Sequence, residues 1–305
     1  MAQLQRAHVI LICGFNIVSS PVAVVGNALI IATIWRNSSL RTPSYIFLDG
    51  IAITDFFTGL ITQPVFIAYM FGNPSLFDNK ALRITALRIF NTIGRYFYSV
   101  TIVTATVMAT ERWFYMRRRS FITVRRAYFI FATILLALVP FSMLRLWLVP
   151  QESIRDFFDL FTMGSLSVIC LAITSFSYFK VFCIIKRQQL QVVAINQASQ
   201  NLGQPAAINL TKYRKSVSTI LYILLLFWGT FLPQAICVSI VFFNNNRADT
   251  KMAYSIFHFA ATLCFLSSAL NPLLYNWRLK DIRQEVKLLV RKIACKNWKE
   301  TSLAG

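Results

Sequence analysis

Hydrophobic residues in this sequence gather into long runs instead of the short alternating patterns of soluble domains. Seven runs are long enough to cross a bilayer, at roughly 9–35, 44–71, 84–116, 127–149, 160–185, 215–243 and 252–276. A transmembrane helix needs about 20 predominantly apolar residues. The pattern therefore predicts an all-α membrane protein, a seven-transmembrane helix bundle that uses up nearly all of the 305 residues.

A different pattern follows the seventh run. Apolar residues recur there at helical spacing among Lys and Arg, at Leu279, Ile282, Val286, Leu289 and Ile293. Such a sequence is typical of an amphipathic helix that lies on a membrane surface. We therefore expect a short extracellular N-terminus at 1–8, a seven-transmembrane helical domain at 9–276, and a short amphipathic helix 8 with a cytoplasmic tail at 277–305. Cys295 closes the amphipathic segment and is a candidate for lipidation.

The charge of the chain is low in amount but strongly asymmetric. Charged residues make up 14% of the sequence and hydrophobic residues 56%, and the net charge is +20. The Lys and Arg residues concentrate in the segments that follow spans one, three, five and seven. By the positive-inside rule, that side is cytoplasmic and the N-terminus is extracellular. Contact with anionic membrane lipids accounts for the basic surface, so no nucleic-acid partner is indicated.

Several polar residues lie inside the predicted spans. They are Asn27, Asp55, Thr101, Ser268 and Asn271. A carboxylate within a bilayer is costly and is a functional candidate, and one shared cluster in the bundle would satisfy all five side chains. Such an oxygen-rich pocket suits a small cation with water. The alternative is a neutral, hydrogen-bonded Asp55 that only holds helices together.

Prolines interrupt the sixth and seventh spans at Pro233 and Pro272. A proline frees a backbone carbonyl that must find another partner in lipid, so each is a candidate hinge, although many membrane helices carry proline only as a fixed kink. Span three ends on Glu111-Arg112-Trp113. Spacing alone favours an ordinary pair of charges at the membrane interface.

Together these motifs resemble those of the rhodopsin-like (class A) G-protein-coupled receptors. The resemblance covers nearly the whole chain. It rests on five motifs in order: Gly26-Asn27, Ile51-Ala52-x-x-Asp55, Glu111-Arg112-Trp113, Phe227-x-x-Thr230-Phe231-Leu232-Pro233 and Asn271-Pro272-x-x-Tyr275. Phe231 replaces the tryptophan usual in the fourth motif, Leu87 stands at the site of the usual span-three cysteine, and no partner cysteine follows span four.

The resemblance implies a receptor, not an enzyme, that activates a heterotrimeric G protein by movement of helices 6 and 7. It implies switch or coupling roles for Glu111, Arg112, Trp113, Tyr178, Phe227, Phe231, Pro233, Asn271, Pro272 and Tyr275. The five intramembrane polar residues named above would hold an allosteric sodium ion, and no other cofactor is expected.

The ligand is not defined by these motifs. By alignment, Gly94 replaces the aspartate of amine receptors and Phe265 the lysine of opsins, so neither ligand class is favoured. Candidate ligand-binding residues are Gln63, Arg95, Tyr98, Phe231, Gln234 and His258. Arg95 in the outer half of span three favours an anionic or lipid-like ligand, unless it points to another helix or to the membrane surface.

Two other classes stay open from the sequence. Broken helices with polar residues also suit a membrane transporter or channel, although no internal repeat is visible. A membrane enzyme is disfavoured because His8 and His258 are far apart in the sequence and no catalytic arrangement is evident. We expect the Gln-rich segment at 188–212 to be a solvated loop without a fold of its own.

Overall fold

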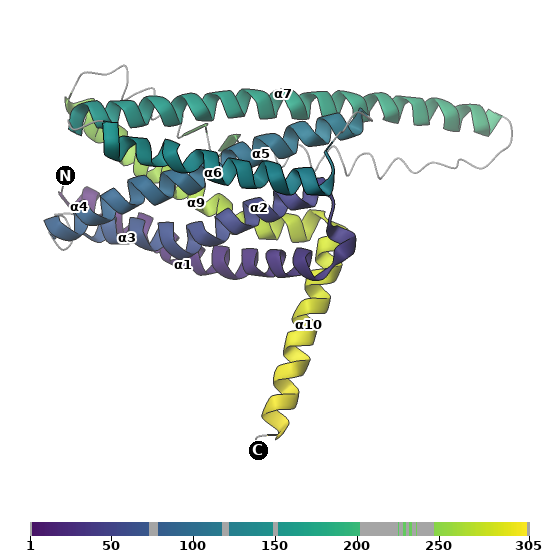
Figure 1. The fold of residues 1–305 in the computed structure, drawn as a ribbon, viewed down its shortest axis with the longest axis horizontal. Helices are drawn as coiled ribbons and strands as arrows, with labels where there is room; N and C mark the ends of the chain where they lie inside the picture. The colour runs from purple at the N-terminus through teal and green to yellow at the C-terminus, as the bar shows by residue number, and fades with distance from the viewer. Residues whose placement is uncertain are drawn as a thin grey trace.

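The computed structural model describes residues 2–72, 79–117, 122–148, 152–201 and 247–303, with single positions between 225 and 236. This part of the chain is helical and contains no strand, as predicted (Figure 1). The elements are α1 (Ala2–Arg36), η1 (Ser38–Leu40), α2 (Pro43–Phe57), η2 (Thr58–Thr62), α3 (Gln63–Phe71), α4 (Lys80–Ile89), η3 (Phe90–Gly94), α5 (Arg95–Met116), α6 (Val124–Leu148), α7 (Glu152–Asn201), α9 (Arg247–Arg278) and α10 (Lys280–Leu303).

Five of these helical stretches are long and apolar enough to cross a membrane. They are Arg6–Arg36, Pro43–Phe71, Val124–Met143, Phe161–Gln191 and Ser255–Arg278. The third predicted span is formed by α4, η3 and α5, and its outer half carries several arginines, which lower its apolar character. The sixth predicted span lies almost entirely outside the described residues. The arrangement is that of the predicted seven-helix bundle.

Spans two and three each contain a π-helical turn that the hydrophobic pattern did not predict. In span two, η2 ends immediately before α3, where Pro64 is the second residue. Proline cannot donate the next backbone hydrogen bond, and a wider turn is a common way for a helix to absorb that loss. The turn η3 lies against η2, and an added Cβ at Gly94 would come within 3.1 Å of Thr62 Cγ2. A larger side chain at position 94 would therefore require its neighbours to shift.

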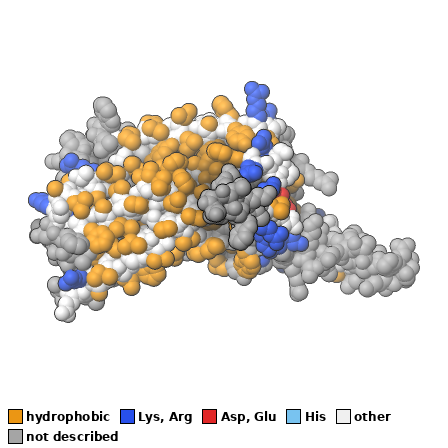
Figure 2. All heavy atoms as spheres, turned by 90° about the horizontal axis from the view of Figure 1, so that it is seen from below, with side chains coloured by type: hydrophobic (Ala, Val, Ile, Leu, Met, Phe, Trp, Pro, Cys, Tyr) orange, Lys and Arg blue, Asp and Glu red, His pale blue; other side chains and the backbone are white. Residues whose placement is uncertain are grey.

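The outside of the bundle is apolar over its middle and basic towards its ends. Figure 2 shows hydrophobic side chains spread over this face, with Lys and Arg gathered at the two ends. Large side chains such as Val18, Phe129 and Leu136 are 70%, 75% and 73% exposed. Such exposure is expected where lipid, not water, surrounds a helix.

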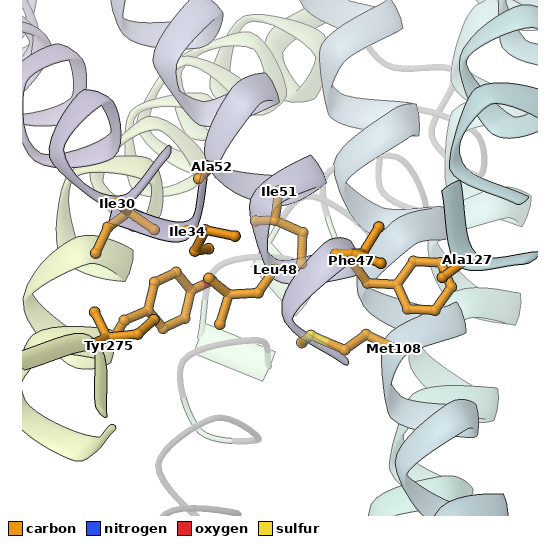
Figure 3. Close-up of a cluster of buried hydrophobic side chains, with 11 residues drawn as sticks. Ile30, Ile34, Phe47, Leu48, Ile51, Ala52, Met108, Ala127 and Tyr275 are labelled. Carbon is orange, nitrogen blue, oxygen red and sulfur yellow. The ribbon is translucent and has the colours of Figure 1, made fainter. Parts of the chain in front are cut away.

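The main hydrophobic core fills the inner half of the bundle. It joins Ile30 and Ile34 of α1, Phe47, Leu48, Ile51 and Ala52 of α2, Met108 of α5, Ala127 of α6 and Tyr275 of α9 (Figure 3). Ile282 of α10 belongs to the same cluster and is fully buried. Val286 also packs against this cluster and Leu289 is buried, so α10 is held over more than its first turn, and its C-terminal part points away (Figure 1).

Two helices are longer than expected. We expected residues 188–212 to be an unfolded loop, and this prediction is wrong for its first half because α7 continues to Asn201. Residues 188–201 contain Gln, Leu and Ala, which favour helices, and no Gly or Pro; the first breaker is Gly203. Figure 1 shows this end of α7 extending beyond the bundle. Similarly, α10 continues past Cys295 to Leu303 and is not short.

Candidate functional site

A buried polar centre joins α1, α2 and α9 in the middle of the bundle. Asp55 is 1% exposed. Its Oδ1 accepts a hydrogen bond from Ser268 Oγ at 2.7 Å, and its Oδ2 accepts one from Asn271 Nδ2 at 2.8 Å. Asn27 Nδ2 donates to the backbone carbonyl of Ser268 at 2.9 Å. The structure thus brings together four of the five residues that the sequence placed in one cluster.

Pro272 explains why Asn27 donates to that carbonyl. In an unbroken helix the N–H of residue 272 would bond to the oxygen of residue 268, but proline has no N–H. The side chain of Asn27 supplies the missing donor from another helix. Next to it, an added Cβ at Gly26 would lie 2.9 Å from Pro272 Cγ, so a glycine allows the proline ring to pack directly against α1.

The fifth residue, Thr101, lies beside the centre but points its hydroxyl elsewhere. Thr101 Oγ1 donates to Thr54 Oγ1 at 2.8 Å, one residue before Asp55. The oxygens gathered at the centre are a carboxylate, hydroxyls and the Oδ1 of Asn27, which is buried without a hydrogen-bond partner. Hard cations prefer such ligands, so these residues fit a sodium ion chemically.

At the inner end of α5, Glu111 is buried and held by α2. It is 2% exposed and accepts a hydrogen bond from Ser44 Oγ. No ion pair joins Glu111 to Arg112 in the described part of the chain. The neighbouring Tyr45 hydroxyl donates to Asp281 Oδ2 of α10 at 3.3 Å. Consecutive residues of the first turn of α2 therefore contact α5 and α10.

Arg112 faces two buried tyrosines. It lies within electrostatic range of Tyr178 on α7 and Tyr275 on α9, which also interact with each other. The Tyr178 hydroxyl is buried and lacks a hydrogen-bond partner. Trp113 packs against Phe176 of α7, with ring centroids 5.5 Å apart, and against the buried cluster that contains Tyr178. Arg112 of α5 is thus close enough to tyrosines of two other helices to act on them electrostatically.

The ligand-binding candidates fall into two groups in the outer half of the bundle. Tyr98 of α5 shares a hydrogen bond with Ser167 of α7 at 2.7 Å. Arg95 begins α5 one turn earlier and is half-buried, with Nε and Nη1 shielded from solvent. Gln63, the first residue of α3, lies elsewhere and is fully buried against α1.

His258 of α9 is close to α3, where it shares a hydrogen bond with the Tyr69 hydroxyl at 3.2 Å. The remaining candidates have no side chain that the structure describes. Phe227, Phe231 and Gln234 lie outside the described residues, as does the side chain of Cys295. Pro233 is described and is half-buried in a helical turn.

Sequence reasoning missed a second buried network that surrounds Gln63. Asn16 Nδ2 donates to Thr262 Oγ1 at 3.1 Å, and Gln63 Nε2 donates to Asn16 Oδ1 at 3.2 Å and Ser19 Oγ at 2.8 Å. One signal for it was available. Asn16 precedes Asn27 by eleven residues, about three helical turns, so both amides lie on the same face of α1.

These observations define a polytopic helical membrane protein with a buried polar centre and a separate buried cluster at the inner end of α5. The family model described as "7 transmembrane receptor (rhodopsin family)" matches residues 26–275. The chain therefore belongs to the rhodopsin family of seven-transmembrane receptors.

Three relatives illustrate the range of this similarity. The bovine (Bos taurus) adenosine receptor A3 is 23% identical over 88% of this chain and 86% of its own length. Cannabinoid receptor 1 of Xenopus laevis is 23% identical over 92% of this chain and 63% of its own length. Human (Homo sapiens) sphingosine 1-phosphate receptor 2 is 24% identical over 96% of this chain and 77% of its own length. The chain is thus a G-protein-coupled receptor, a multi-pass membrane protein that has an extracellular ligand and couples to a G protein; none of these comparisons supports a transporter.

Proposed function

We propose that this receptor switches between two packings of α9 and the sixth span, and that the polar centre at Asp55 sets the balance between them. The observation that carries the proposal is the contact of Asn27 with the carbonyl that Pro272 leaves free, because it ties a hinge in α9 to α1. A ligand bound in the outer half needs only a difference in affinity between the two packings to shift them.

In this scheme Arg112 is the residue that meets the G protein. Movement of α9 and of the sixth span at Pro233 would open the inner end, and Tyr178 and Tyr275 would support Arg112 in the open packing. The N-terminus would be outside the cell and the basic inner face at the plasma membrane inside. A sodium ion at Asp55, Asn27, Ser268 and Asn271, with Thr101 beside them, would favour the resting packing.

The ligand we propose is anionic or lipid-like. Arg95 in the outer half of span three supports this chemistry, because a partly desolvated guanidinium binds a carboxylate or phosphate strongly. Two of the relatives are named for cannabinoid and for sphingosine 1-phosphate, and the latter name includes a phosphate. Gly94 provides no carboxylate that would bind an amine.

Nucleotide exchange on a panel of purified G proteins tests the switch without a known ligand. We expect the full-length receptor to catalyse basal exchange on at least one G protein. Arg112→Ala should abolish that exchange, whereas Arg117→Ala, an exposed arginine one turn further on, should preserve most of it. Equal exchange by wild type and Arg112→Ala would refute the assigned role of Arg112.

A further inference from the structure

The outer end of the bundle brings together basic groups from three helices and a tyrosine from a fourth. His8 of α1 and His258 of α9, the only histidines in the chain, lie with ring centroids 6.4 Å apart. Tyr69 of α3 bonds to His258, and the Arg83 guanidinium of α4 lies 5.8 Å from the centre of the Tyr69 ring. We call His8, Tyr69, Arg83 and His258 the outer basic cluster. Residues 250 positions apart in sequence thus meet at one place.

No acidic group neutralises this cluster within the described residues. Arg83 forms no ion pair and no side-chain hydrogen bond there, although it is half-buried and close enough to His258 to act on it electrostatically. His8 Nε2 is shielded from solvent and lacks a hydrogen-bond partner. Buried polar groups are nearly always paired, so the unpaired ring nitrogen of His8 requires an explanation.

The charge of the cluster decides what kind of partner fits it. Two imidazoles are also zinc ligands, but zinc normally takes three or four protein ligands. No group of three His, Cys, Asp or Glu residues forms in the described part of the chain. The positive charge of Arg83 would also repel a divalent cation. An anion is favoured instead, because arginine and histidine N–H groups donate well to carboxylates and phosphates.

From this arrangement we infer that the outer basic cluster binds the phosphate or carboxylate head group of the receptor's ligand. The inference rests on the proposed function, since it gives a position to the charged end of an anionic ligand. It places that end between α1, α3, α4 and α9. Arg95 lies on another side of the bundle, one turn from Ser99, which contacts Met163 of α7. The cluster is therefore a separate anion site from the one that the sequence suggested.

This position would link the ligand directly to α9. His258 is one turn before Thr262, whose hydroxyl donates to the His258 carbonyl at 2.9 Å and accepts from Asn16 of α1. Phe66 of α3 packs against both His258 and Phe265, with ring centroids at 6.1 and 5.4 Å. A head group that draws His8, Arg83 and His258 together therefore acts on the outer half of the helix that carries Pro272.

Binding to the purified full-length receptor in neutral detergent tests the inference. The probes are inorganic phosphate, dodecyl phosphate below its micelle concentration, and uncharged dodecanol, at matched ionic strength. The readout is the thermal unfolding midpoint as a function of probe concentration. We expect at least one of the two phosphates to stabilise the wild type and dodecanol to have no comparable effect. Stabilisation by inorganic phosphate indicates a free anion as ligand, and stabilisation by dodecyl phosphate alone indicates a lipid.

Substitutions then locate the site. Arg83→Gln should weaken phosphate binding about tenfold or more, as expected for loss of a charge-assisted hydrogen bond. His8→Gln should weaken it several-fold, and Arg88→Gln, an exposed control on the same helix, should leave it unchanged. Without phosphate, Arg83→Gln should be at least as stable as the wild type because it removes an unneutralised charge. A purely structural arginine would instead lower that stability.

Three results would overturn the inference: no binding of either phosphate to the wild type, equal binding by Arg83→Gln, or equal stabilisation by dodecanol. None of these measurements uses a G protein. If basal exchange depends on Arg112 but phosphates do not bind, the proposed switch stands and the anion site fails. If phosphate binds as expected but basal exchange does not depend on Arg112, the anion site stands and the proposed switch fails.

Discussion

Removing the amide of Asn27 should destabilise the receptor through a carbonyl on another helix. Asn27 and Ser268 are 0% and 4% exposed, and they are joined by the 2.9 Å bond from Nδ2 to the Ser268 oxygen. Leaving a buried acceptor unpaired costs about 1–3 kcal/mol, and side-chain hydrogen bonds in membrane proteins measure at the lower end, roughly 0.6–1.7 kcal/mol. We therefore expect Asn27→Ala to lower stability by about 1–2 kcal/mol.

The link to the proline is tested by a double-mutant cycle. In Pro272→Ala the backbone N–H of residue 272 is restored and can donate to the Ser268 carbonyl, so the amide of Asn27 is needed less. The cost of Asn27→Ala should then fall by about 1 kcal/mol, roughly 2–4 °C in the unfolding midpoint. The cavity left by the shorter side chain is present in both backgrounds and cancels from the comparison.

Asn16→Ala is the matched control for this cycle. Asn16 is an equally buried asparagine on α1, and its bonds to Ile12 and Thr262 do not involve Pro272. Its cost should be the same in both backgrounds. Thermal unfolding of all six proteins in detergent gives both coupling energies. Additivity of Asn27→Ala and Pro272→Ala within about 0.3 kcal/mol would refute the reasoning.

Three further predictions concern other contacts. Sodium should lower basal nucleotide exchange of the wild type relative to potassium, and Asp55→Asn should remove that difference; persistence of the sodium effect in Asp55→Asn would exclude the site. Gly50→Ala should destabilise the receptor by about 1–3 kcal/mol, because its Cβ would lie 2.5 Å from Phe131 Cε2. Adding Phe131→Leu should restore most of the lost stability, and Gly14→Ala, which has open space around it, should leave the stability unchanged. Ser44→Ala should raise basal nucleotide exchange several-fold, because Glu111 loses its hydrogen-bond donor. The control Ser39→Ala loses only a local bond to Asn37 and should not change the exchange rate. Unchanged exchange in Ser44→Ala would show that the bond to Glu111 does not restrain the switch.

The sequence was most informative inside the apolar spans, because lipid offers polar groups there no hydrogen-bond partners. A carboxylate, two amides and a hydroxyl inside apolar spans have only one another as partners, so Asp55, Asn27, Ser268 and Asn271 could be placed together without a structure. The seven-helix fold followed from run lengths for the same reason. Helices that leave the bilayer were harder to predict, and the extension of α7 to Asn201 depends on local helix propensity with no hydrophobic pattern to mark it.

Contacts between distant segments could not be predicted. His8 and His258 are separated by nearly the whole chain, and only the packing of α1 against α9 reveals that they meet. The hydrogen bond from Ser44 to Glu111 depends on where the first turn of α2 lies relative to α5, and the hydrophobic pattern of the sequence does not predict that position. The π-helical turns were also missed, since they shift the register of a span without changing its composition.

Ser44 and Tyr45 are neighbours in sequence, yet one touches the buried acid of α5 and the other the first turn of α10. Both contacts are made from the same turn of α2, so a displacement of that turn would act on both of them at once. A partner that moves α10 together with this turn of α2 would therefore also disturb the bond between Ser44 and Glu111. A sensor attached to α10 would in turn report the state of the inner switch.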